Sequence, residues 1–244
     1  MDRRDFFKTM LCTSLLTPLL LRSETGPGSL ELHLVAEEPE LFISQILNEL
    51  QKHNVIKGKS FAFIDSHPKE KPMRPLLLKN GWVEAPATTQ AEMTFSFRFL
   101  QHKTLPSFAL IKGGSVLDIR TNKLYSLWNE MNKNHSSSAC LTIASFKNKP
   151  AFVHPGETVL VYKSGRVIDR ISLSKPSTKS YAMKNGFITV QIKEGKARVI
   201  ESSCRHKICV YSPPVFHSGD QIVCAPNHFL LKIQGPHPID TVIG

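Results

Sequence analysis

The sequence predicts an α+β protein of two domains, in which an N-terminal α+β domain is followed by a small all-β barrel or sandwich. The 244 residues, 41% hydrophobic and 21% charged, suffice for two ordinary domains that each bury a core. Helical periodicity is present in the first half of the chain and stops after the polar stretch 147–150, where short strands with glycine turns begin. We therefore expect an export segment and linker at 1–28, an α+β domain at 29–149 and a β domain at 150–244.

The first half of the α+β domain alternates strand and helix. Residues 30–36 alternate as a strand does, and apolar side chains then recur at helical spacing behind a proline that a first helical turn tolerates: Pro39, Ile43, Ile46, Leu47 and Leu50. Residues 60–65 predict a second strand. The stretch 66–92 is polar and contains prolines, so we expect a long excursion with only a short apolar knot at 76–78.

The second half of this domain starts with a clean alternation at 93–99, which is typical of a half-buried strand. A hairpin is predicted around Gly113 and Gly114, with strands at 108–111 and 115–119. A second helix is marked by Leu124, Leu127, Trp128 and Met131, and a closing strand by residues 140–144. The aromatic side chains at 95, 97 and 99 are expected to form core rather than a stacking platform for nucleic acid.

The C-terminal domain consists of short apolar stretches separated by turns. Strands are predicted at 158–162, 167–173, 187–192 and 197–200, with turns at Ser164-Gly165, Asn185-Gly186 and Glu194-Gly195. This spacing is that of a small barrel or sandwich.

The N-terminus predicts an extracytoplasmic location. Arg3, Arg4 and Phe7 form a pattern that resembles the twin-arginine export motif, a receptor-read address. The apolar run at 10–21 is shorter than the roughly 20 residues of a membrane span, so a signal peptide is predicted. The cleavage site is weak, and an uncleaved segment would anchor the protein to the membrane.

The net charge of +11 is spread along the chain rather than gathered in one block. It predicts a solvated surface, with polyanion binding as the alternative. The candidate residues for that alternative are Arg166, Arg170, Lys193, Lys196 and Arg198. An exported protein rarely meets chromosomal DNA, so envelope polymers or anionic lipid are expected in place of nucleic acid.

The segment 201–233 holds three of the five cysteines and three histidines, a density of reactive groups found nowhere else in the chain. Cys204 is followed by Cys209, then by a Ser/Pro-rich loop, by Gly219 to Cys224 and by Pro226-Asn227. This order resembles the family of the second domain of NusG transcription factors. The resemblance covers the C-terminal third and implies a small exported or membrane-anchored β domain of unassigned activity.

The simplest interpretation of the cysteines is a disulfide that staples the β domain. Cys204 and Cys209 bracket a loop short enough to close, and Cys224 arrives on the next strand. Once the export segment is removed, Cys140 makes the number of cysteines even, and three complete pairings are open. The family resemblance supports the cysteines as a recurrent feature of this module.

A metal site is the main alternative. Cys204, His206, Cys224 and His228 resemble the Cys-x-His and Cys-x-x-His pairs of Rieske iron–sulfur proteins, although three residues separate the last two here. The same four residues would also suit a single zinc or copper ion. A third alternative is thiol–disulfide exchange by Cys204 and Cys209, whose basic neighbours favour the thiolate.

The sequence favours a non-enzymatic function. It has no Gly-x-Ser-x-Gly, no His-Glu-x-x-His and no nominated carboxylate pair. Isolated histidines such as His33 are expected on the surface or in loops. We therefore expect an exported binding or assembly module with other envelope proteins as partners and without a cofactor, and a redox or metal-binding protein as the alternative.

Overall fold

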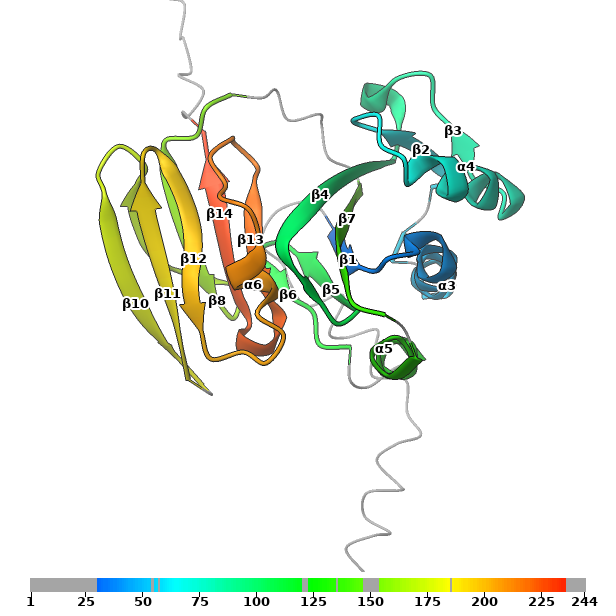
Figure 1. Ribbon diagram of the computed structural model, residues 1–244. Coiled ribbons are helices and arrows are strands. Elements are labelled where there is room, and N and C mark those ends of the chain that lie inside the picture. The colour runs from blue at the N-terminus through cyan, green and yellow to red at the C-terminus, as the bar shows by residue number, and fades with distance from the viewer. Residues whose placement is uncertain are drawn as a thin grey trace, which may run out of the picture.

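The computed structural model describes residues 30–53, 55–56, 58–119, 123–134, 136–146, 154–184 and 186–235. In this part of the chain a seven-stranded sheet lies between three helices on one face and the C-terminal β domain on the other (Figure 1). The protein is thus mixed α/β with most of its regular structure in strands, as predicted. Among the described residues, no helix has both the length and the apolarity of a membrane span.

The seven-stranded sheet has the order β3-β2-β4-β7-β1-β5-β6. Strand β2 runs parallel to both of its neighbours, and every other adjacent pair is antiparallel. The bounds of its strands are β1 (Leu30–Val35), β2 (Ser60–Phe63), β3 (Val83–Glu84), β4 (Met93–Thr104), β5 (Ser107–Lys112), β6 (Ser115–Val116) and β7 (Ser138–Phe146). The strands and the hairpin predicted for this domain are therefore confirmed.

Three helices supply the other half of the N-terminal core: α3 (Pro39–Lys52), α4 (Glu70–Lys79) and α5 (Lys123–Asn134). Helices α3 and α5 were predicted, and their apolar stripes pack on the sheet as the spacing implies. Phe95 of β4 is fully buried in the same core and Phe97 packs against it, but Phe99 at the end of this row is 63% exposed. The expectation of an aromatic core therefore holds for two of the three rings.

Helix α4 corrects the expectation of an irregular excursion. Met73 and Leu77 are buried four residues apart on one face of this helix, which is enough to dock it on the core. Two prolines, Pro72 and Pro75, obscured the pattern, because an interior proline normally argues against a helix. A single-turn 3₁₀ helix, η1 (Thr88–Gln90), lies in the same stretch.

Strand β1 is buried on both faces, which alternation alone would not predict. Leu30, Leu32 and Leu34 enter the core beneath the helices. The opposite row consists of Glu31, His33 and Val35, and all three are buried as well. Because neighbouring side chains of a strand point to opposite faces, this second row faces the C-terminal domain. The prediction of a surface histidine at 33 was wrong.

The C-terminal domain consists of two open antiparallel sheets around one core. Their orders are β10-β11-β12 and β13-β14-β8-β9. The bounds are β8 (Thr158–Lys163), β9 (Arg166–Ser172), β10 (Ser177–Met183), β11 (Gly186–Lys193), β12 (Lys196–Ser202), β13 (Gln221–Cys224) and β14 (Phe229–Gln234), with the short helices α6 (Ile208–Tyr211) and η2 (Ala225–Asn227) between strands. A β-rich domain is confirmed, whereas a closed barrel is not shown by these sheets.

The two domains pack against each other through a small apolar cluster. Val35, Leu100, Leu141 and Ile143 of the large sheet form it, and Ile208 and Tyr211 of α6 pack against it. Close approach continues at the β5–β6 turn, where a Cβ on Gly114 would lie 2.7 Å from the Tyr162 ring. The large sheet therefore has two covered faces, and the second one forms a wall of the candidate site.

Candidate functional site

Three cysteines of the C-terminal domain converge on one point from three different elements. Cys204 follows the end of β12, Cys209 lies in α6 and Cys224 is the last residue of β13. Their sulfur atoms all lie within 4.8 Å of one another, and Cys204 Sγ is 3.6 Å from Cys209 Sγ. All three residues are buried, and all are free thiols. We call these three residues the thiol cluster.

Polar side chains at the end of β12 and in η2 hold the thiol cluster in place. Ser202 Oγ accepts a hydrogen bond from the backbone N–H of Cys204 at 3.2 Å and lies 3.8 Å from Cys224 Sγ. Asn227 Nδ2 donates to Cys224 Sγ at 3.4 Å and is 3.4 Å from Ser202 Oγ. Both polar residues are themselves buried. The orientation of the sulfurs is therefore fixed by hydrogen bonds as well as by packing.

The segment between β12 and α6 and the segment between η2 and β14 each contain a non-glycine residue whose backbone is in the left-handed conformation. Lys207 has a φ of 54°, and its carbonyl accepts the backbone N–H groups of Val210 and Tyr211 at the start of α6. The Lys207 ammonium also donates to the carbonyl of Ser202. His228, at a φ of 46°, ends the η2 turn after Cys224. Such conformations are uncommon for residues with side chains, and here the surrounding contacts determine them.

The three thiols do not ionise independently. Hydrogen bonds from the Cys209 and Cys224 thiols lower the pKa of Cys204, while the contacts of Cys209 with Cys204 and Cys224 raise the pKa of Cys209. The pKa of Cys224 is raised to about 11, and the largest cause is its hydrogen bond with Cys204. Cys204 is therefore the thiol that loses its proton first. Burial, followed by the charge of Arg205, lowers the pKa of the adjacent His206.

The thiol cluster lines a cavity of about 360 Å³ between the two domains. Its walls are mainly apolar. The N-terminal domain contributes Val35, Phe108, Ala109, Leu117, Trp128 and Leu141 among others, and the C-terminal domain contributes Ile208, Val223, Ala225 and Pro226 beside the cysteines. Several polar groups also reach the cavity: His33, Ser107, Asp118, His206, Ser212, Gln221 and His228. The cavity has the volume and the lining of a small-molecule site.

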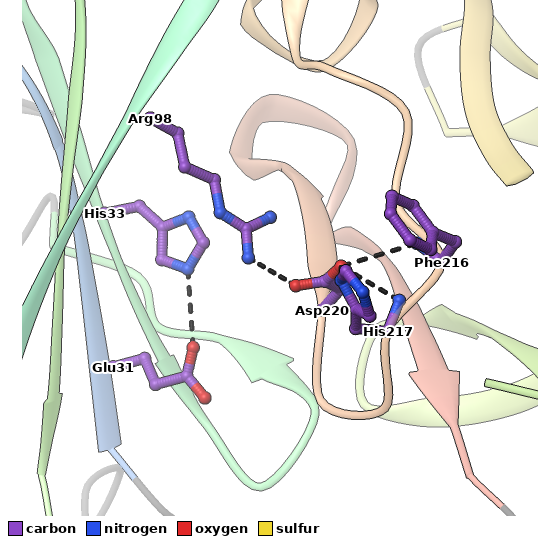
Figure 2. A network of polar contacts seen from close by, with 6 residues as sticks. All are labelled: Glu31, His33, Arg98, Phe216, His217 and Asp220. Atoms are coloured by element: carbon purple, nitrogen blue, oxygen red, sulfur yellow. Dashed lines mark hydrogen bonds and ion pairs between the residues drawn. The ribbon is translucent and has the colours of Figure 1, made fainter. Parts of the chain in front are cut away.

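Two polar contacts belong to the same interface, one of them buried and the other partly buried. His33 Nε2 lies 3.4 Å from Glu31 Oε2 on the face of β1 that meets the C-terminal domain. From β4, Arg98 reaches across the interface to the carboxylate of Asp220, as Figure 2 shows. Asp220 Oδ2 also accepts the backbone N–H of His217 at 3.1 Å, so one carboxylate joins the β13 loop to the large sheet.

The predicted disulfide candidates separate into two groups. Cys204, Cys209 and Cys224 come together, although no disulfide is formed between them. Cys140 lies on β7 in the row of Ala144 and Phe146, which face the helices, whereas Leu141 in the other row lines the cavity. Because the two rows point to opposite faces of the sheet, Cys140 lies on the far side from the thiol cluster. Any staple within the cluster stays a prediction.

The predicted set of two cysteines and two histidines is not assembled as one ligand sphere. Among the described residues, the thiol cluster is the only group of three or more potential ligand atoms within 4.8 Å of one another. His206 and His228 line the same cavity outside this group. The His206 ring lies 6.1 Å from that of Trp128, and its carbonyl accepts a hydrogen bond from Thr104. Cys209 replaces the histidines in the observed cluster.

The five candidate polyanion residues are exposed on three strands of two different sheets. Four of them have partners within the protein: Arg170 with Gln234, Lys193 with Glu194, Lys196 with the Phe216 ring and Arg198 with Gln191. Arg166 begins β9. Polyanion binding by this face stays a prediction. The export residues Arg3, Arg4 and Phe7 lie outside the described residues.

Sequence reasoning missed the N-terminal half of the site. Ala109 and Trp128 gave no functional signal, because each fits an ordinary strand or helix pattern. The one available clue was the Glu31-x-His33 pair inside an otherwise apolar strand, since buried charged groups need partners. That pair now lies at the interface beside the cavity.

The match to a known family lies in the part of the chain that contains the thiol cluster. Residues 137–237 match the family model of NusG domain II. The matched segment begins directly before β7 and spans the whole described C-terminal domain, including all three cysteines of the cluster. The resemblance inferred from the cysteine segment is thus confirmed for the C-terminal part. No curated protein matches the chain.

Similar solved structures correspond to about a third of the chain. A DUF1312 family protein from Ruminococcus gnavus ATCC 29149 is 26% identical, with a TM-score of 0.30, covering 32% of this chain and 99% of that one. A DUF1312 family protein from Enterococcus faecalis V583 is 19% identical, with a TM-score of 0.31, over 33% and 98% of the two chains. The Lin0431 protein from Listeria innocua is 19% identical, with a TM-score of 0.32, over 34% and 99%.

Proposed function

We propose that the protein is an exported, non-enzymatic binding module of the cell envelope, which takes a small apolar ligand in the cavity between its two domains. The observation that carries this proposal is the cavity itself, because it is about 360 Å³ in volume, mainly apolar and lined by both domains. Small-molecule sites in proteins are typically apolar pockets of roughly 300–1,000 Å³ with a few oriented polar groups, often at domain interfaces.

The arrangement of the cavity favours binding over chemistry. Its polar groups come from both domains, as His33 of β1 and Gln221 of β13 illustrate, and would orient a ligand along the interface. A ligand held by both walls is favoured only when the domains are docked, so binding would couple to the interdomain contacts. Other envelope proteins would then be the partners that bind the ligand-bound form.

Export remains a part of this proposal that rests on the sequence. Arg3, Arg4 and Phe7 supply the twin-arginine pattern, and an uncleaved segment would hold the module at the membrane. The test is cell fractionation: the full chain is expected on the extracytoplasmic side, and a cytoplasmic location would contradict the proposal.

Binding to the cavity is tested with the neutral apolar dye N-phenyl-1-naphthylamine. Its emission is expected to rise saturably with one dye per chain, with energy transfer from Trp128, which lines the cavity. Ala109 is half-buried in the cavity wall, so Ala109→Phe fills the space and is expected to weaken binding at least tenfold. Ala182→Phe on the exposed edge of β10 is the matched control and should bind as the parent does.

Three results would contradict the binding site. The first is the absence of saturable dye binding to the folded chain. The second is an equal loss of affinity in the Ala109→Phe and Ala182→Phe variants. The third is unchanged binding by an Ala109→Phe chain that circular dichroism shows to be folded.

A further inference from the structure

The thiol cluster has the spacing of a metal site rather than of a disulfide. A disulfide joins two sulfurs at about 2.05 Å and leaves a third sulfur without a role. An ion bound at the usual 2.3 Å from each thiolate separates its sulfur ligands by about 3.8–4.0 Å. The Sγ atoms of Cys204 and Cys209 are 3.6 Å apart, and all three sulfurs lie within 4.8 Å of one another. Changes of no more than about 1 Å in the sulfur–sulfur distances would bring all three to the spacing of ligands around one ion.

The surroundings of the cluster support ligand geometry. The backbone N–H of Lys207 donates to Cys204 Sγ, and Asn227 Nδ2 donates to Cys224 Sγ. Hydrogen bonds of this kind to the ligating atom orient it and stabilise its anionic form. Ser202 Oγ contacts both the backbone N–H of Cys204 and the side-chain amide of Asn227, so it links the segments that hold Cys204 and Cys224. Three thiols used only as apolar core would not need this set of donors.

The donor set also selects the class of ion. The cluster contains three sulfurs and no carboxylate oxygen, and thiolates favour Cu(I), Zn²⁺ and iron–sulfur clusters over oxygen-preferring ions such as Mg²⁺ or Ca²⁺. The cluster lines the cavity, so an ion would enter from there, and a coordination position would face the cavity.

We propose that Cys204, Cys209 and Cys224 bind a single thiophilic d¹⁰ cation, Cu(I) or Zn²⁺, at the wall of the interdomain cavity. Each cysteine that becomes a ligand releases its thiol proton to solvent, so binding is accompanied by proton release. The site lies beyond the proposed apolar ligand function and does not depend on it. It also differs from the Rieske-like set, because it uses Cys209 and neither histidine.

The test uses the full chain, reduced and kept anaerobic, and equilibrated separately with Cu(I) and with Zn²⁺. After desalting, one ion per chain is expected to remain bound for at least one of the two metals. The metal that stays bound in competition with a colorimetric chelator is the one that the site holds. Cys204→Ser, Cys209→Ser and Cys224→Ser are each expected to weaken binding by more than the roughly 10–100-fold typical of outer-sphere changes. Cys140→Ser, a buried cysteine outside the cluster, is the matched control and should retain the ion.

Two further arms keep the test decisive. His206→Ala and His228→Ala should retain one ion per chain, and a loss equal to that of the cysteine variants would overturn the three-sulfur site. X-ray absorption of the loaded parent chain should count three sulfur neighbours, which requires no variant to fold. A reduced, folded parent chain that retains neither ion would overturn the proposal, and dye binding to the cavity could still succeed or fail independently.

Discussion

At the scale of single residues, Asp169 shows how one carboxylate joins the two sheets of the C-terminal domain. It lies on β9, and its Oδ2 accepts hydrogen bonds from Lys179 Nζ at 2.9 Å and Tyr181 Oη at 2.7 Å, both on β10. Strands β9 and β10 are the edges of different sheets. Burial disfavours the carboxylate, but the hydrogen bonds from Lys179 and Tyr181 outweigh it and lower the pKa of Asp169.

The lowered pKa gives the Asp169→Asn variant a pH signature. A carboxyl whose pKa is lower in the folded than in the unfolded state stabilises the protein above the unfolded pKa, and this stabilisation is lost as the pH falls through the folded value. The side chain is 24% exposed, so we expect a loss of about 1 kcal/mol at pH 7 that shrinks towards zero below the ordinary aspartate pKa of about 3.9. Urea unfolding of the parent and the variant, at pH 7 and at a pH below that pKa, measures the difference in stability. Asp65→Asn, at an exposed position, is the control, and a pH-independent difference would contradict the assignment.

At the scale of elements, what the sequence predicts well is what local periodicity determines. Helix α3 follows from the spacing of Ile43, Ile46 and Leu47, and the first half of β4 from the alternation of its apolar residues, because each pattern records the apolar face that packs into the core between the sheet and the helices. Helix α4 did not follow, since its only buried apolar pair is Met73 and Leu77 and two prolines interrupt it. The burial of His33 could not be predicted either, because the second covered face of β1 depends on a domain far along the chain.

The same distinction applies to the candidate site. The density of cysteines in residues 201–233 indicated the correct segment, and the resemblance to NusG domain II is confirmed there. The choice of Cys209 over the histidines was not available from spacing, because it depends on where α6 places its side chain. The cavity was also not predictable, since it exists only where Ala109 and Trp128 meet the C-terminal domain.

Helix α4 yields a prediction about its two exposed prolines. Pro75 lies inside the helix and removes a backbone donor, whereas Pro72 lies in the first turn, where donors lack helical partners. Replacement of Pro75 by alanine restores a hydrogen bond, and the greater freedom of the unfolded chain offsets part of that gain. We expect Pro75→Ala to stabilise the protein by about 1–2 kcal/mol and Pro72→Ala to change its stability by less than about 0.5 kcal/mol. Equal effects of the two substitutions in urea unfolding would argue against this account of α4.

At the scale of the whole molecule, the decisive feature is that two domains share one interface and one cavity. Two close contacts span the interface: the Gly114 turn lies against the Tyr162 ring, and Thr104 Oγ1 donates a hydrogen bond to the carbonyl of His206. The ion pair of Arg98 with Asp220 is a further contact between the domains. Because Asp220 also organises its own loop through the backbone N–H of His217, only Arg98 reports on docking alone.

A double-mutant cycle on Arg98→Gln and Asp220→Asn therefore measures how strongly a charge pair docks the domains. The side chains are 31% and 13% exposed, so the pair is partly desolvated, and we expect a coupling of about 1–2 kcal/mol in urea unfolding. Asp220→Asn should cost more than Arg98→Gln, because it also weakens the loop. The matched cycle uses Lys52→Gln and Glu49→Gln, whose lysine is 66% exposed, with an expected coupling below about 0.5 kcal/mol. If the interdomain coupling were as small as that of this surface pair, the charge pair would contribute little to docking the domains, and the Arg98→Gln chain would bind dye as the parent does.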